Sequence, residues 1–318
     1  MLDIDTFLTT VYVMVDDFCK QHPAERINRP GPAPSLTASD VITLGIFAQW
    51  NQFPTERALY RFALRRLRPA FPGLPHRSQF NRLLRHQADE ICRLGRWLAS
   101  QLDAPTCAYE TLDGFGVATR NTQRRARGWL PGIATIGRCS RLGWYEGLHG
   151  LTATTPTGAI TGWGLAPAST KEQPFAETFL AARHTPHPRL PEVGAPARGY
   201  YVTDNGFMGH DLQQHWADDY DAHLVTPPHP NGKIHWPPVL QTSIAGLRQM
   251  VETVHERLLH TFRIDRERPH DLTGLRTRMA AVVALHTTCM WINQRLGRDR
   301  LAFCDLVDWE ITRSHTKR

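Results

Sequence analysis

The hydrophobic periodicity of this chain changes near residue 105, and this change constrains its fold more than any other feature. Up to that point apolar residues recur every three or four positions, which is typical of amphipathic helices. Beyond it, short runs of β-branched and aromatic residues alternate with helical stretches. Such alternation favours a layered α/β unit with a mixed sheet, so we expect a helical first part and an α/β second part.

The first part is expected to be an all-α N-terminal domain over residues 1–104. A first helix is predicted at 2–20, and a second follows a capping box that begins at Thr37. A third is predicted at 56–67, after the cap Thr55, and a fourth begins near Ser78. The proline-rich run 28–34 predicts an extended linker. Several arginines lie on the outer faces of these helices: Arg57, Arg61, Arg65, Arg66, Arg77, Arg82 and Arg85. These arginines are equally compatible with a DNA-binding module and with a helical packing domain in which they only increase solubility.

The second part is expected to be one α/β domain over residues 105–297, followed by a tail at 298–318. Strands are predicted at 107–113, 144–154, 158–165, up to Asp204 and at 222–226, with helices at 171–182, 209–216, 243–259 and 273–296. Residues 114–141 have the composition of a basic loop. This order is that of a ribonuclease H-like core, which is a mixed sheet flanked by helices.

Three acids stand at positions that such a core brings together. Asp113 ends the first predicted strand, Asp204 ends the fourth, and Glu252 lies in the helix 243–259. In the ribonuclease H-like order the first and fourth strands are neighbours, so the two aspartates should lie side by side. Close carboxylates repel one another unless cations lie between them. Mg²⁺ prefers such oxygen ligands, and two ions about 3.5–4 Å apart support in-line displacement at phosphorus.

Each acid also has an ordinary structural explanation. Asp113 could simply terminate a strand, and Asp204 could form a turn by hydrogen-bonding its own backbone. Glu252 could be a solvated helix residue paired with Arg248. Glu256 lies one turn further along the same helix and is an alternative third ligand; the resemblance described below, through Arg248, implies Glu252.

The charge of the chain favours a phosphate-rich partner. Lys and Arg outnumber Asp and Glu by 37 to 30, which gives a net charge of +7 and a pI near 9.3. Most of the cations are arginines, whose guanidinium groups suit phosphate, although a solvated basic surface explains the same balance.

Other function classes find no support in the sequence. The six cysteines include no C-x-x-C pair, so neither a disulfide framework nor a zinc knuckle is indicated. His255 and His260 are one residue too far apart for the zinc-protease H-E-x-x-H motif, and no P-loop motif occurs. No apolar run reaches the roughly 18 residues of a membrane span, so the cytoplasm is the expected compartment.

At its acidic motifs the chain resembles the DDE transposases of bacterial insertion sequences. The sequence D-N-G-F at 204–207 resembles the second-acid motif of that family, and R-Q-M-V-E at 248–252 resembles its Arg-x-x-x-Glu motif. Leu112 and Asp113 resemble the first acid, residues 144–151 the second strand, and residues 74–82 the amino-terminal region of one subgroup. The resemblance covers roughly residues 29–295.

This resemblance implies an enzyme that binds the ends of an insertion sequence, cleaves DNA and joins the freed 3′-hydroxyl to target DNA. It implies that Asp113, Asp204 and Glu252 are catalytic and hold two Mg²⁺ ions, for which Mn²⁺ can substitute. It also implies a homodimer on DNA and a location at the bacterial nucleoid. Five arginines are expected to contact DNA: Arg120, Arg124, Arg125, Arg127 and Arg248. Two alternatives remain: a DNA-binding protein derived from a transposase without catalytic activity, and a structure-specific nuclease of the same fold.

Overall fold

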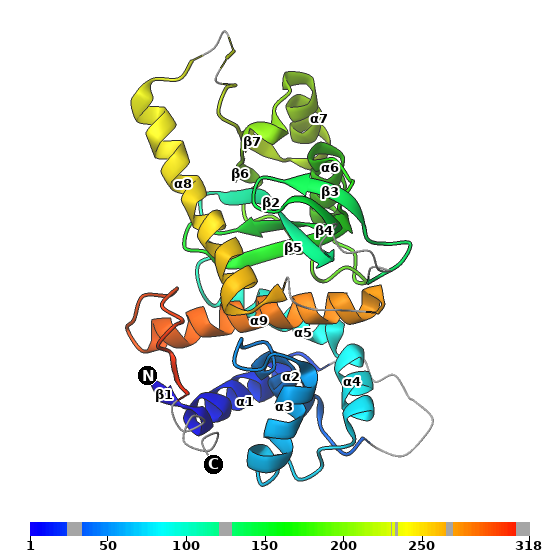
Figure 1. Ribbon diagram of the computed structural model, residues 1–318. Coiled ribbons are helices and arrows are strands. Elements are labelled where there is room, and N and C mark those ends of the chain that lie inside the picture. Colours follow the sequence, from blue (N-terminus) through cyan, green and yellow to red (C-terminus); the bar gives the residue numbers. More distant parts are fainter. Residues whose placement is uncertain (24–33, 121–128, 230, 233–234, 265–269, 310–318) are drawn as a thin grey trace.

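The computed structural model describes residues 1–23, 34–120, 129–229, 231–232, 235–264 and 270–309. The described residues form a mixed α/β protein in which helices flank a curled mixed sheet, as expected (Figure 1). The predicted linker at 28–34 lies almost wholly outside the described residues. No helix in the described segments is long and apolar enough to cross a membrane.

The helical part spans residues 4–100. Its elements are α1 (Ile4–Gln21), α2 (Ala38–Phe47), α3 (Glu56–Phe62), a π-helical turn (Ala63–Leu67), α4 (Arg77–His86) and α5 (Ala88–Ser100). The predicted capping box is confirmed, because Thr37 Oγ1 accepts from the Asp40 amide while the Asp40 carboxylate accepts from the Thr37 amide. The expectation of one long helix from Ser78 onwards is wrong, since Gln87, with φ −94° and ψ 5°, ends α4 and begins α5.

In the described residues, six strands form one sheet. They are β2 (Glu110–Arg120), β3 (Thr135–Cys139), β4 (Gly143–Thr154), β5 (Ile160–Pro167), β6 (Tyr200–Val202) and β7 (His223–Val225). The order is β3-β4-β2-β6-β7, with β5 also paired to β4. β4 runs antiparallel to β2, β3 and β5, whereas β2, β6 and β7 are parallel neighbours. The sequence did not predict β3, which lies within the expected basic loop.

The first strand is longer than expected, and this places Asp113 inside it. The prediction that this strand ends at Asp113 is wrong, because β2 continues through Gly114 and Gly116. The two glycines pair with Leu151 and His149 of β4. A Cβ on Gly114 would lie 2.5 Å from His149 Nε2, so glycine here serves close packing against β4 and does not break the strand.

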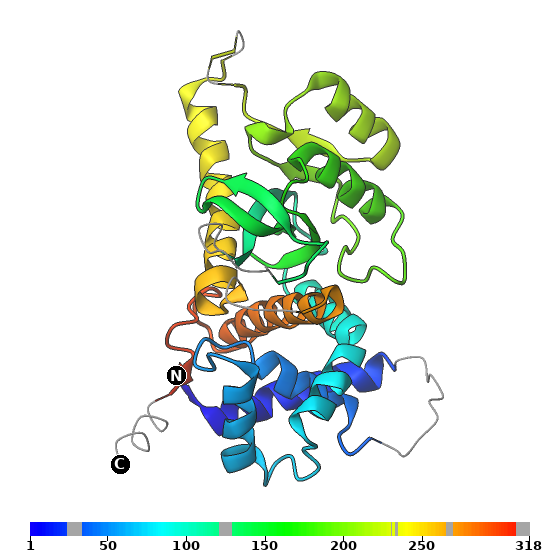
Figure 2. The same cartoon turned by 45° about the vertical axis from the view of Figure 1, so that its right-hand side comes forward.

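Helices cover both faces of the sheet (Figures 1 and 2). α6 (Glu172–His184) and α7 (His210–Tyr220) lie on one face, while α8 (Pro238–Glu256) and the π-helical turn after it (Arg257–Thr261) lie on the other. A short 3-10 turn (Asn205–Phe207) connects β6 to α7. The predicted helices at 171–182, 209–216 and 243–259 are thus confirmed, with α8 beginning five residues earlier at Pro238.

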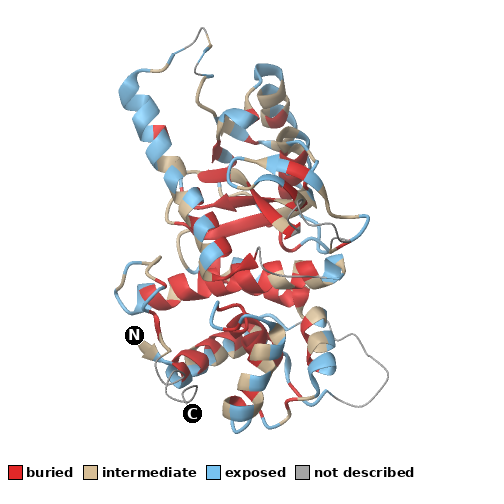
Figure 3. Ribbon diagram, viewed as in Figure 1, coloured by how far each residue is buried: buried red, intermediate tan, exposed pale blue. Residues whose placement is uncertain are grey.

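The helical part and the sheet meet on α9 (Leu272–Arg295), which is buried along most of its length (Figure 3). Its predicted buried stripe is confirmed: Leu275, Met279, Val282, Val283, Cys289 and Met290. One hydrophobic cluster joins this helix to α1, α2, α5 and the sheet residues Phe115 and Trp163. The two ends of the described chain also meet, since β1 (Leu2–Asp3) pairs with β8 (Val307–Asp308). The boundaries at residues 104 and 297 stay predictions.

Candidate active site

A cleft of about 990 Å³ opens beside β2 and β6, and residues of both α8 and the start of α6 line it. All three predicted acids line it: Asp113 from β2, Asp204 just after β6, and Glu252 from α8. Glu256 and Arg248 line the same cleft, so both alternatives for the third acid face it. The fold therefore brings together residues that are 91 and 48 positions apart in the sequence.

The parallel pairing of β2 and β6 explains why Asp113 and Asp204 face one cleft. Glu110 pairs with Tyr201 and Thr111 with Val202, an offset of 91 positions that also separates the two aspartates. Each aspartate accepts one backbone hydrogen bond, at 2.9 Å to Asp113 Oδ1 and 2.8 Å to Asp204 Oδ1. Asp204 thus also acts as a turn residue. In the described part of the chain, no donor reaches the Oδ2 atom of either one.

Glu172 is a fourth acid of this cleft, and the sequence analysis did not single it out. It is the first residue of α6, and its side chain is partly buried. A Cβ built on Gly206 would lie 2.2 Å from Glu172 Oε2 and 2.9 Å from Asp204 Oδ1, so the two carboxylates face each other across this glycine. An acid in the first turn of a helix is ordinary, and this position gave no sequence signal beyond its place in the helix that follows β5.

The acids perturb one another. Burial raises the pKa of Asp113 to about 7, helped by the nearby charges of Asp204 and Glu252. The pKa of Glu172 is likewise raised to about 7, mainly by burial and then by the charges of Asp204 and Asp113. Arg248 opposes both shifts, because its positive charge favours the ionised carboxylates. A cation bound among these groups would relieve the same repulsion more fully.

Glu252 and Glu256 stand on the exposed side of α8. The neighbouring residues Val251, Val254 and His255 face inward and fix the helix on the sheet. His255 Nε2 lies 2.8 Å from Thr152 Oγ1 of β4. Burial, followed by the charge of Arg141, lowers the pKa of His255 to about 3, so this histidine stays neutral. The two glutamates are thereby held along the cleft on a rigid helix.

Basic side chains and an exposed aromatic ring also line the cleft. The cations are Arg138, Arg141, Lys171 and Arg248, and the aromatic residue is Trp144, which is 65% exposed. Arg138 and Trp144 are cross-strand partners on the hairpin of β3 and β4. Of the other expected DNA contacts, the Arg120 side chain and all of Arg124, Arg125 and Arg127 lie outside the described residues.

The chemistry of these side chains suits a hard divalent cation, although the described side chains do not form a complete coordination sphere. Among the described residues, no three His, Cys, Asp or Glu side chains converge closely enough to hold a metal ion as they stand. The donors that face one another are carboxylate oxygens, which Mg²⁺ and Mn²⁺ prefer, and Mg²⁺ retains several waters in such open sites. Asp113, Asp204, Glu172 and Glu252 are therefore the residues that fit a cation here.

Comparison with known proteins identified no relative of this chain. The chain gave no significant match when it was searched against protein-family models, curated proteins and solved structures.

Proposed function

We propose that this chain is a transposase that cleaves and joins DNA strands with divalent cations. One observation carries the proposal: two parallel neighbouring strands bring Asp113 and Asp204 to a cleft that both acidic and basic side chains line. The carboxylates suit metal ions, and the basic side chains suit the phosphates of the substrate. The combination is what phosphodiester chemistry on DNA needs.

The strand order supports a ribonuclease H-like core within this proposal. Leaving out the additional strand β3, the order is β5-β4-β2-β6-β7. The first three strands along the chain, β2, β4 and β5, form an antiparallel meander, and β6 then joins β2 in parallel. We therefore propose that residues 105–297 form this core and that residues 1–104 form an N-terminal helical domain that binds DNA.

In the proposed reaction the side chains of the cleft have distinct tasks. Asp113 and Asp204, with Glu252 as the third acid expected from the sequence, would hold two Mg²⁺ ions. When bound, such ions activate the attacking oxygen and stabilise the leaving oxygen of an in-line displacement. Arg138 and Lys171 would bind phosphates at the cleft wall. The products would be a free 3′-hydroxyl and then a new bond to target DNA, on both ends of an element held by a homodimer at the nucleoid.

The DNA that flanks the gene provides the test. Purified protein, Mg²⁺ and a duplex that carries the flanking inverted repeats should yield cleaved ends and products joined to a second DNA. Cleaved ends without joined products would instead identify a structure-specific nuclease of the same fold. Tight end binding without cleavage would identify a DNA-binding protein that has lost catalysis.

A further inference from the structure

Glu172 is distinguished by the direction of its side chain. Position alone means little, since acids in the first turn of a helix compensate the helix dipole. Its two oxygens, however, point back toward the strands that carry the aspartates. A Cβ on Gly114, the neighbour of Asp113, would lie 3.0 Å from Glu172 Oε1, and a Cβ on Gly206 would lie 2.2 Å from Oε2. Both glycines thus leave room for this one carboxylate.

The start of α6 is fixed to the loop that follows Asp204. Gln173 Nε2 donates to the backbone oxygens of Gly206, at 3.1 Å, and Met208, at 2.8 Å. These two bonds hold Glu172 beside Asp204 without using its carboxylate. Among the described residues, no hydrogen-bond donor is found for the Glu172 carboxylate itself, so its oxygens stay available to a ligand.

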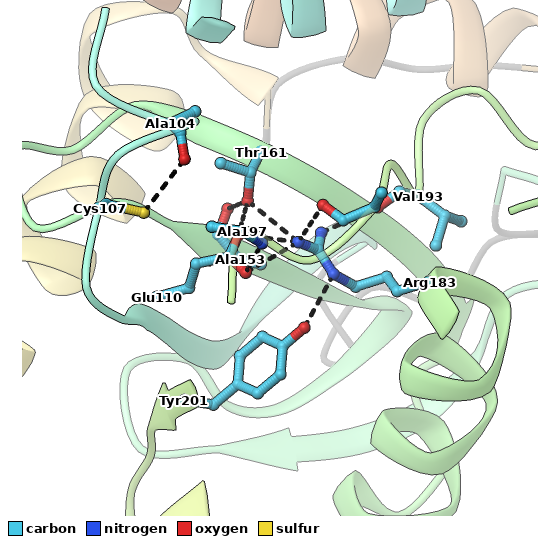
Figure 4. A network of polar contacts seen from close by, with 10 residues as sticks. Ala104, Cys107, Glu110, Ala153, Thr161, Arg183, Val193, Ala197 and Tyr201 are labelled. Atoms are coloured by element: carbon cyan, nitrogen blue, oxygen red, sulfur yellow. Dashed lines mark hydrogen bonds and ion pairs between the residues drawn. The ribbon is translucent and has the colours of Figure 1, made fainter. Parts of the chain in front are cut away.

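A buried ion pair fixes the other end of the same helix (Figure 4). Arg183, in the last turn of α6, donates to Glu110 Oε1 at 2.7 Å and to the Tyr201 hydroxyl at 3.1 Å. Glu110 lies three residues before Asp113 in β2, and Tyr201 lies three residues before Asp204. One network therefore joins the three elements that bring Asp113, Asp204 and Glu172 to the cleft. The helix α8, which carries Glu252, has no part in this network within the described residues.

We propose that Glu172 is a metal-ligating carboxylate of this site, together with Asp113 and Asp204. The inference rests on the proposed function, because the metal is the one that the strand cleavage needs. It assigns a ligand that the acidic motifs of the sequence do not contain. The rigid positioning of its helix at both ends is what a metal ligand requires, since a loosely held carboxylate would bind weakly.

The test compares Mn²⁺ binding by the full-length wild-type protein and three variants. Glu172→Gln removes the proposed ligand, Asp204→Asn serves as the reference loss, and Asp211→Asn removes an equal charge from an exposed position outside the cleft. Titration calorimetry at about pH 8, where free carboxylates are ionised, gives each dissociation constant. Glu172→Gln should weaken Mn²⁺ binding about tenfold or more, whereas Asp211→Asn should change it by less than about threefold.

Stability without metal separates a ligand from a structural residue. In EDTA, Glu172→Gln should melt at the wild-type temperature or above it, because the change removes one of several repelling charges. A lower melting temperature in EDTA would overturn the proposal in favour of a structural role. Unchanged Mn²⁺ affinity of Glu172→Gln would also overturn it. If Asp204→Asn alone lost Mn²⁺ binding, the proposed function would still stand. Equal Mn²⁺ binding by wild type and Asp204→Asn would contradict the proposed function itself.

Discussion

Replacement of Arg183 by methionine should cost more stability than any surface change in this protein. The Arg183 side chain is 1% exposed and donates to five groups, including the Val193 carbonyl at 2.9 Å and the Ala195 carbonyl at 2.8 Å. Its main partner, Glu110, is completely buried. Methionine would fill similar volume but would leave the two carbonyls without this donor and the carboxylate without its positive partner, with only Thr161 Oγ1 and the Ala197 amide still donating to it.

The expected loss follows from the uncompensated charge. Removal of one partner from a buried ion pair typically costs about 3–5 kcal/mol, because the other charge stays in a medium of low polarity. The matched double variant Glu110→Gln, Arg183→Met removes that charge, and the introduced glutamine would still accept from the Ala197 amide, which lies 3.1 Å from Glu110 Oε2. We therefore expect the double variant to recover about 2 kcal/mol or more of the loss.

Urea unfolding followed by far-UV circular dichroism gives the free energies of unfolding for these variants. Arg189→Met provides the control, since Arg189 is an exposed arginine of the loop after α6 and its loss should cost less than about 0.5 kcal/mol. The reasoning is refuted if Arg183→Met lies within about 1 kcal/mol of wild type, or if the double variant is no more stable than Arg183→Met alone.

Three further predictions concern pH and DNA. Burial lowers the pKa of His255 to about 3 and that of His286 to about 4, so below about pH 6.5 the unfolded chain binds protons that the folded chain does not. Over the same range the folded chain holds protons on Asp113 and Glu172, whose pKa values burial raises to about 7, and this opposes the effect of the histidines. In an Asp113→Asn, Glu172→Gln background the free energy of unfolding should therefore fall between about pH 6.5 and 4, by up to about 1.4 kcal/mol per pH unit for each histidine, and a flat profile in urea titrations of that variant would contradict this. Arg138→Ala should reduce the slope of log affinity against log salt by about 0.9, measured by fluorescence anisotropy, and an unchanged slope would argue against a phosphate contact. Trp144→Ala should weaken binding to DNA with unpaired end bases about tenfold while Trp144→Phe retains most of it, and equal losses in both would argue against base stacking.

Local signals in the sequence were sufficient for most helices. The side chains of Thr37 and Asp40 cap each other across the first turn of α2, and Thr55 caps α3, so both starts could be read directly. The buried stripe of α9 likewise follows from apolar spacing alone. The break at Gln87 could not be predicted, because no proline or glycine marks it.

The strands show where local signals mislead. Gly114 and Gly116 are ordinary breakers in isolation, yet they extend β2 because β4 approaches too closely for a side chain. β3 contains Gly137 and Arg138 and lacks a regular apolar alternation, so it read as a loop. A Cβ on Gly137 would lie 2.2 Å from the Ala168 carbonyl, another contact made only in the folded chain.

The candidate site was predictable in part for the same reason. Asp113 lies within a recognisable strand and Asp204 follows another, and the register of β2 and β6 does bring them to one cleft. Glu172 stands in an ordinary helix start, and only the tertiary approach of α6 to Gly206 makes it an active-site candidate. Glu172 is close to Asp204 only in space and belongs to no sequence motif, so a sequence pattern does not reveal it.

Cleavage of end DNA by the Asp204→Asn variant tests the central claim most directly. Wild-type and variant protein are each incubated with Mg²⁺ and labelled duplex that carries the flanking repeats, and binding to the same duplex is measured in parallel. The account predicts Mg²⁺-dependent nicks with a 3′-hydroxyl for wild type, and no nicks but near-normal end binding for Asp204→Asn. Full cleavage by Asp204→Asn, or cleavage by wild type that persists in EDTA, would contradict a metal-dependent reaction at this cleft.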